Sequence, residues 1–267
     1  MSATIALMTD FGLTDPFAGI MKGVILSINP SAQIVDISHG IQPGDIKAAS
    51  FALSMTLPFF SEGTIFVCVV DPSVGTDRRA VAADIDGRIV VCPDNGILSW
   101  ILRDRSLCKA VELKNEKRFL PEVNSTFHGR DVFAPVAAHL SLGVPLEEFG
   151  PPASELATFH IPETDTGDRS LQGEAVYIDK FGNLITNIGQ EEFEAWRSKH
   201  PDAPVKVHIA SAEILGISRS FGDVPIGHSS ALFGSAGYLE IAVNGGNAAE
   251  SLGMSVGSRV LLYQLQS

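Results

Sequence analysis

The sequence predicts an α/β protein in two parts, an N-terminal α/β sandwich domain with a mostly parallel sheet and a small C-terminal β-barrel domain. Strand-like and helix-like segments alternate through the first half of the chain, a pattern typical of a parallel sheet covered by helices on both faces. A polar, proline-containing segment follows Gly150-Pro151-Pro152. Beyond it, glycine-rich turns separate short strand-like segments, as in small barrels or sandwiches.

Each element of the N-terminal half has its own signal. The first strand is a short apolar run that stops at Thr9-Asp10, and residues 64–70 are strongly β-branched. Residues 79–92 are predicted to form a hairpin, because Asp86-Gly87 is a favoured two-residue turn. The other periodic segments predict strands at residues 4–8, 34–37 and 110–113, and helices at residues 17–28, 45–57, 96–102 and 132–142.

The C-terminal half contains mainly strand signals. Strands are predicted at residues 173–178, 183–188, 205–209, 238–243 and 258–265, and a helix only at residues 191–199. We therefore place the N-terminal domain at residues 1–155, a linker at residues 156–167 and the barrel at residues 168–267.

Composition excludes several classes of protein. The chain has 267 residues, 45% of them apolar, which is enough to bury a large core and rules out general disorder. Its net charge of −12 opposes binding to nucleic acid. The three cysteines are too irregularly spaced for a zinc site or a disulfide framework. We see no signal peptide and no apolar run near the ~20 residues of a membrane span, so we expect a cytoplasmic protein without a membrane partner.

Three polar loops are predicted to meet at one edge of the parallel sheet. Residues 9–15 and 71–79 each follow a strand, and residues 125–131 precede a helix. Because ligands bind beyond the carboxyl ends of parallel strands, these loops can bring carboxylates, a guanidinium and an imidazole together. A helix cap or a turn is the alternative for any single aspartate, but three such loops together favour a functional site.

Common catalytic motifs give little support. Residues 253–257 match the G-x-S-x-G pattern, but a strand-like run follows them and no histidine lies beyond them. Neither of the usual glycine-rich phosphate loops occurs. Asp10, Asp71 and His128 have the donor types of a metal site. A metal-dependent hydrolase therefore remains an alternative, although no metal-binding spacing supports it and Arg78 would lie nearby as a second cation.

Five sequence blocks occur in a fixed order: Asp10-Phe11-Gly12 with Asp15, Asp71-Pro72 through Gly75 to Arg78-Arg79, Phe127-His128-Gly129-Arg130-Asp131, Asp179-Lys180-Phe181-Gly182-Asn183 and Gly237-Tyr238-Leu239-Glu240-Ile241-Ala242. Together these blocks resemble one known family, the S-adenosyl-L-methionine hydroxide adenosyltransferases, which are hydrolytic relatives of fluorinase and chlorinase. The resemblance covers residues 5–262, nearly the whole chain. It implies an N-terminal α/β domain, a C-terminal barrel and a homotrimer, with the ligand between one subunit's N-terminal domain and its neighbour's C-terminal domain.

The implied reaction needs an activated water. When C5′ of S-adenosyl-L-methionine is attacked, the sulfonium leaves as a neutral thioether, so no general acid is required. By resemblance the catalytic set is Asp71, Arg78 and His128. A carboxylate can orient and deprotonate the water, a guanidinium can stabilise developing hydroxide, and an imidazole can accept or relay the proton. Both Asp71 and His128 remain alternatives for the base.

The resemblance also implies substrate-binding residues. Asp10 would accept from both ribose hydroxyls, Asn183 would pair with the adenine edge, and Phe221 would stack on the purine unless it lies in the barrel core. Asp179 and Glu240 suit the ammonium or sulfonium group, and the backbone near Ser235 suits the carboxylate. Fluorinase has arginines where this chain has Ala236 and Val243, so only a main-chain contact is expected at Val243. The implied substrate-binding set is Asp10, Asp15, Asp179, Asn183, Phe221, Ser235, Glu240 and Val243.

The sequence therefore predicts hydrolysis of S-adenosyl-L-methionine to adenosine and L-methionine, with no metal and no cofactor beyond the substrate itself. A halide-using adenosyltransferase is one alternative, but the charge of Asp71 would repel an anion and Gly129 replaces a fluorinase serine. The other alternative is a non-catalytic module that binds S-adenosyl-L-methionine or adenosine. Such a module would not need Asp71, Arg78 and His128 together.

Overall fold

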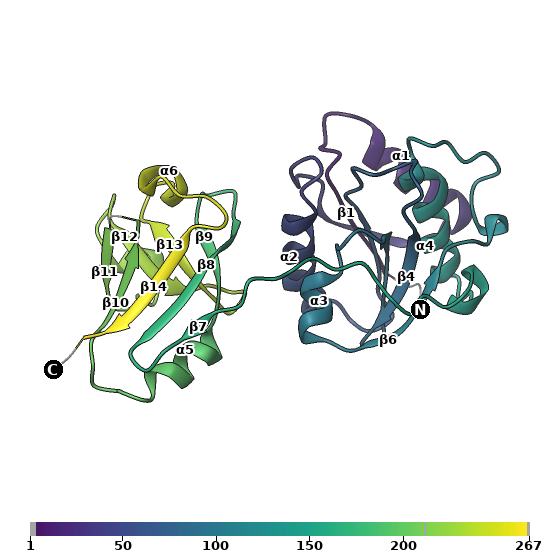
Figure 1. Cartoon of the computed structure of the whole chain (residues 1–267). Helices are drawn as coiled ribbons and strands as arrows, with labels where there is room; N and C mark the ends of the chain where they lie inside the picture. Colours follow the sequence, from purple (N-terminus) through teal and green to yellow (C-terminus); the bar gives the residue numbers. More distant parts are fainter. Residues whose placement is uncertain (1–3, 211, 266–267) are drawn as a thin grey trace. The chain divides into compact units, whose positions relative to one another are not determined.

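The computed structural model describes residues 4–210 and 212–265 (Figure 1). The chain divides into two compact units, residues 1–160 and 161–267, and each is described by itself. None of the helices in the described part combines the length and the apolar character needed to span a membrane.

Unit 1 is built on a mostly parallel sheet with the strand order β2-β1-β3-β5-β4-β6. Strands β2, β1, β3 and β5 run parallel, whereas β4 is antiparallel to both of its neighbours. This arrangement confirms the predicted class of the domain. The strands are β1 (Thr4–Thr9), β2 (Gln33–Ser38), β3 (Ile65–Val69), β4 (Ala80–Ile85), β5 (Arg88–Pro93) and β6 (Leu107–Glu112).

Helices cover both faces of this sheet (Figure 1). On one face α1 (Phe17–Ile28) and α4 (Ala134–Ser141) pack against Ile5 and Leu7 of β1. On the other, α2 (Ile46–Thr56) and α3 (Ser99–Asp104) pack against alternate residues of the same strand, Ala6 and Met8. A strand buried on both faces explains the continuous apolar run near the N-terminus.

The predicted hairpin is present as β4 and β5. Asp86 and Gly87 both have positive φ, 51° and 73°, as a two-residue turn of this kind requires. The Asp84 carboxylate accepts from the Gly87 N–H at 3.0 Å and closes the turn.

The predicted helix at residues 132–142 begins earlier and is not uniform. A π-helical turn covers Gly129–Phe133, and α4 continues from Ala134. Pro135 explains part of this change, because proline has no N–H to donate to the carbonyl four residues earlier. That carbonyl belongs to Asp131, and it accepts instead from the N–H of Leu120 at 2.9 Å.

Unit 2 is an antiparallel barrel-like sheet with the strand order β11-β10-β14-β8-β9-β13-β12, and β7 pairs with β8. An isolated bridge joins Ser218, in the segment that follows β11, to Leu232 of the other edge strand, β12. The predicted barrel is therefore confirmed, although β7, β11, β12 and α6 were not predicted. The elements are β7 (Asp165–Thr166), β8 (Ser170–Ile178), β9 (Leu184–Gly189), α5 (Gln190–Arg197), β10 (Val205–Ile209), β11 (Ala212–Leu215), β12 (Ser229–Phe233), β13 (Tyr238–Val243), α6 (Ala248–Leu252) and β14 (Arg259–Gln264).

Candidate active site

Loops that follow β1 and β3 meet at the carboxyl edge of the unit 1 sheet. The Gly44 N–H donates to Asp10 Oδ2 at 2.8 Å, and a Cβ on Gly44 would lie 3.5 Å from Pro72. Gly75 has a φ of +81°, and a Cβ there would lie 2.5 Å from the carbonyl oxygen of Ser125. The loop that carries Asp71 therefore packs closely on both the Asp10 region and the segment before His128.

Asp71, Arg78 and His128 form one hydrogen-bonded cluster, as their predicted shared role requires. Arg78 Nε donates to both oxygens of Asp71, at 3.0 and 2.9 Å, and Arg78 Nη2 donates to Oδ2 at 2.5 Å. The same Nη2 lies 2.8 Å from His128 Nδ1. Because the Arg78 and Asp71 side chains are only 8% and 5% exposed, this is a buried ion pair in contact with an imidazole.

The hydrogen bond from Arg78 fixes the protonation of His128. Burial, and then the charge of Arg78, lower the pKa of His128 below its ordinary 6.5, so the neutral ring is favoured at neutral pH. Arginine can only donate, so Nδ1 must accept and the ring proton lies on Nε2. His128 is thus a donor through Nε2 in this arrangement. Neither of its nitrogens has a lone pair available to accept a proton from water.

Asp71 keeps the capacity to accept a further hydrogen bond. A carboxylate has about four acceptor sites. Two donor groups of Arg78, together with the Ser73 hydroxyl at 3.3 Å, occupy part of that capacity. Of the two alternatives for the base, the geometry therefore favours Asp71.

Asp10 lies on a loop that is held from several sides. Beside its bond from Gly44, the Gly12 N–H donates to the His39 carbonyl at 2.7 Å, and Thr9 Oγ1 lies 2.8 Å from His39 Nδ1. Asp15 lies farther along the same loop and is exposed. The structure thus brings Asp10 to the sheet edge and leaves Asp15 in solvent.

An aromatic cluster that the sequence argument missed lies beside His128. Phe11, Phe17 and Phe127 form edge-to-face pairs with centroid separations of 5.4 to 5.9 Å. A Cβ on Gly129 would lie within 3.4 Å of Phe11, Phe127 and Met21. This close packing leaves little room for a larger residue at position 129. Phe11 and Phe127 belong to two of the five sequence blocks that resemble the known family. That membership is the sequence signal that could have identified the cluster.

In unit 2, Asp179 and Asn183 shape the turn between β8 and β9. Asp179 Oδ1 accepts from the N–H groups of Phe181 and Asn183, at 2.8 and 2.9 Å. Its Oδ2 accepts from Asn183 Nδ2 at 2.9 Å. The predicted role of Asp179 toward a cation would be additional to this turn-forming role.

A cavity of about 450 Å³ brings three predicted residues together in unit 2. Asn183, Phe221 and Val243 line it, with residues 244–247 and Phe181. Phe221 is not a core residue, because it lies on a short 3-10 turn and is partly exposed. Phe181 is 75% exposed and was not predicted as a site residue, although it stands between Asp179 and Asn183 in one of the recognised blocks.

Glu240 is a buried carboxyl on β13 and is only 7% exposed. Burial, and then the charge of Asp179, raise the pKa of Glu240 above its ordinary value. A Cβ on Gly234 would lie 1.7 Å from Glu240 Oε1, so a larger residue at that position would displace the Glu240 carboxyl. The structure therefore brings Glu240 to the turn that contains Ser235.

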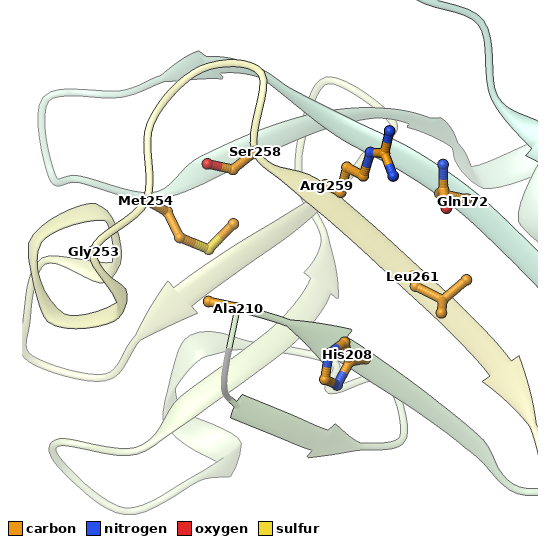
Figure 2. Close-up of a pocket in the computed structure, with 8 residues that line it drawn as sticks. All are labelled: Gln172, His208, Ala210, Gly253, Met254, Ser258, Arg259 and Leu261. Carbon is orange, nitrogen blue, oxygen red and sulfur yellow. The ribbon is translucent and has the colours of Figure 1, made fainter.

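A second concavity, of about 440 Å³, lies outside this set of residues. Figure 2 shows Gln172, Leu261 and His208 on three adjacent strands, with Arg259 beside them. None of the predicted site residues lines it. Within residues 4–210 and 212–265, no group of three or more His, Cys, Asp or Glu side chains is placed to hold a metal ion.

Comparison with known proteins identifies relatives along nearly the whole chain. Residues 5–150 and 173–261 match the family models of the SAM hydroxide adenosyltransferase N-terminal and C-terminal domains, where SAM is S-adenosyl-L-methionine. An (R)-S-adenosyl-L-methionine hydrolase from Thermus thermophilus is 39% identical, with 97% of this chain and 98% of the relative covered. A fluorinase from Nocardia brasiliensis is 29% identical, with 96% of this chain and 95% of the relative covered. A crystal structure of an uncharacterized conserved protein from Thermotoga maritima has a TM-score of 0.90 at 35% identity, covering 97% and 99% of the two chains.

Proposed function

Because the chain belongs to the SAM hydroxide adenosyltransferase family, we propose that it hydrolyses S-adenosyl-L-methionine to adenosine and L-methionine. The observation that carries this proposal is the buried contact of Asp71, Arg78 and His128 at the carboxyl edge of the sheet. These groups can activate water, and the negative charge of Asp71 disfavours a halide nucleophile.

In the proposed mechanism the water is held between Asp71 and His128. His128 Nε2–H donates to the water oxygen, and Asp71 accepts a water proton as the C5′–O bond forms. The C5′–S bond breaks, and its electron pair leaves with sulfur as the neutral thioether of methionine. Arg78 holds Asp71 and His128 in place and compensates the buried negative charge.

The substrate contacts are proposed for both units. Asp10 accepts from the ribose hydroxyls, and the cavity beside Asn183 holds adenine against Phe221 and Phe181. Glu240 receives the α-ammonium group, since a buried carboxyl beside a cation regains its charge. Asp179, the Ser235 backbone, the main chain of Val243 and Asp15 complete the proposed set.

We further propose a homotrimer in the cytoplasm, with each ligand between the N-terminal domain of one subunit and the C-terminal domain of its neighbour. No metal, nucleic acid or membrane takes part. Light scattering on the purified protein checks the oligomer, because a ligand-bound monomer would contradict the shared site.

Turnover that disappears in EDTA and returns with a divalent cation would contradict the metal-free reaction.

Product analysis tests the function directly. The purified chain is incubated with each sulfonium epimer of S-adenosyl-L-methionine in water labelled with oxygen-18, with and without chloride or fluoride. We expect adenosine labelled at its 5′-hydroxyl and unlabelled methionine in every buffer. The epimers are compared because the relative from Thermus thermophilus is named for the R form. A 5′-halogenated product, or binding without any turnover, would support one of the two alternatives instead.

The protonation of His128 predicts a pH profile. Burial and Arg78 lower the pKa of His128 below 6.5, so kcat/KM should stay level through neutral pH and fall only below that lowered pKa. The fall occurs because a protonated Nδ1 can no longer accept from Arg78. The measurement is kcat/KM from about pH 4.5 to 8, which reports groups of the free enzyme. A midpoint above 6.5 that is absent in His128→Asn would contradict the assignment.

A further inference from the structure

His128 is presented by a short folded segment, residues 124–128. Thr126 donates to Asn124 Oδ1 from its N–H and its hydroxyl, at 2.9 and 2.7 Å. The Phe127 N–H donates to the carbonyl of Asn124 at 3.3 Å. The position of His128 therefore depends on what holds Asn124.

Asp131 holds Asn124 from the turn that follows His128. Its side chain is fully buried, with 0% exposure, and Oδ2 accepts from the Asn124 N–H at 2.8 Å. Its main-chain carbonyl accepts from the Leu120 N–H at 2.9 Å, a bond that is available because Pro135 has no N–H. Asp131 therefore connects the π-helical turn to two points of the chain. One is Leu120, which precedes the segment, and the other is Asn124, its first residue.

Arg130 supplies the cation that a buried carboxylate requires. Its Nε donates to Asp131 Oδ1 at 2.5 Å, and its Nη2 donates to Oδ2 at 2.9 Å. The guanidinium also lies over the Phe127 ring, 5.2 Å from the centroid. The pair therefore contacts Phe127, which precedes His128, and Asn124 at the start of the segment.

We propose that Asp131, paired with Arg130, is a positioning residue that keeps His128 Nδ1 within hydrogen-bonding reach of Arg78. It acts through segment 124–128 and is not placed in contact with the substrate. The test has a kinetic part and an NMR part. Only the kinetic part depends on the proposed function, because the NMR part measures the pKa and tautomer of the His128 ring.

The test compares Asp131→Asn with the wild-type chain by NMR titration of the histidine ring, with His128→Asn used for assignment. Burial and Arg78 lower the pKa of His128, while Asp71 and Asp131 raise it. Removal of the Asp131 charge alone would lower the pKa further. Release of the segment would instead remove burial and the contact with Arg78, which are the two causes that lower the pKa. We therefore expect the pKa to rise toward 6.5 and the fixed Nε2–H tautomer to become mixed.

The kinetic readout should separate turnover from binding. We expect kcat to fall by about 10- to 100-fold, the effect of a small misplacement at a reacting centre, while KM changes little because Asp10 keeps its hydrogen bond from the Gly44 N–H. Arg130→Lys keeps the cation but loses the two-pronged contact, so it should give a smaller change in the same direction and serves if Asp131→Asn does not fold. Asp86→Asn removes the charge of a different aspartate–arginine pair, between Asp86 in the β4–β5 turn and Arg105 after α3, and should leave both readouts unchanged.

An unchanged or lowered His128 pKa with an unchanged tautomer in a folded Asp131→Asn chain would overturn the proposal. A wild-type chain with no hydrolase activity would instead refute the proposed function and leave the titration result valid.

Discussion

Asp71→Asn is expected to reduce turnover by ~10²–10⁴-fold, the usual loss when a general base is removed. The substitution keeps the size and reach of the side chain but removes its charge and most of its basicity. KM should change much less, because ribose and adenine are held by Asp10 and Asn183 in the proposed mechanism. Steady-state kinetics on S-adenosyl-L-methionine measures both effects.

The matched control for this variant is Asp104→Asn. Asp104 also accepts two hydrogen bonds from an arginine, Arg103, but it is exposed at the end of α3. It should keep wild-type kinetics. If Asp71→Asn turns over at a near wild-type rate while binding collapses, Asp71 anchors the ligand and His128 becomes the better assignment for the base.

Arg78→Gln should be the most destabilising of the single substitutions considered. It leaves the Asp71 carboxylate, which is 5% exposed, without its cation, and breaking a buried pair in this way costs about 3–5 kcal/mol of the free energy of unfolding. Turnover should also fall by about 10²-fold, because Asp71 and His128 lose the group that holds them in place. Denaturant unfolding and steady-state kinetics are the two measurements.

A double variant separates the charge effect from simple loss of packing. Arg78→Gln combined with Asp71→Asn removes both charges, so it should be more stable than Arg78→Gln alone. Arg105→Gln is the control, because its partner Asp86 is partly exposed and can be solvated. Equal stability of Arg78→Gln and the control would mean that the buried pair does not carry the expected energy.

Local sequence was sufficient for much of the fold. The Asp86-Gly87 turn could be predicted because few residue pairs adopt the positive φ angles that it needs. Strand β1 could be predicted because burial on both faces requires a continuous apolar run. Strands β11 and β12 were missed because both are short. In addition, the stretches that surround them are rich in glycine or contain serine. Their pairing depends on partners elsewhere in the barrel, on β10 and β13.

The sequence by itself determined the residue types of the site and the order in which they occur. Its resemblance to a known family implied Asp71, Arg78 and His128 as one set, and the structure places them in contact. It also identified the loops that reach the carboxyl edge of a parallel sheet, because strand direction follows from the alternation of strands and helices.

Only the tertiary structure decided how these groups contact one another. Asp71 and Arg78 are seven residues apart, but His128 is 50 residues from Arg78, and no local pattern states which nitrogen of its ring meets the guanidinium. That single contact requires Nδ1 to accept, puts the proton on Nε2 and favours Asp71 as the base. A hydrogen bond between distant residues depends on how the two loops pack, and close packing of Gly75 on Ser125 is what brings them together.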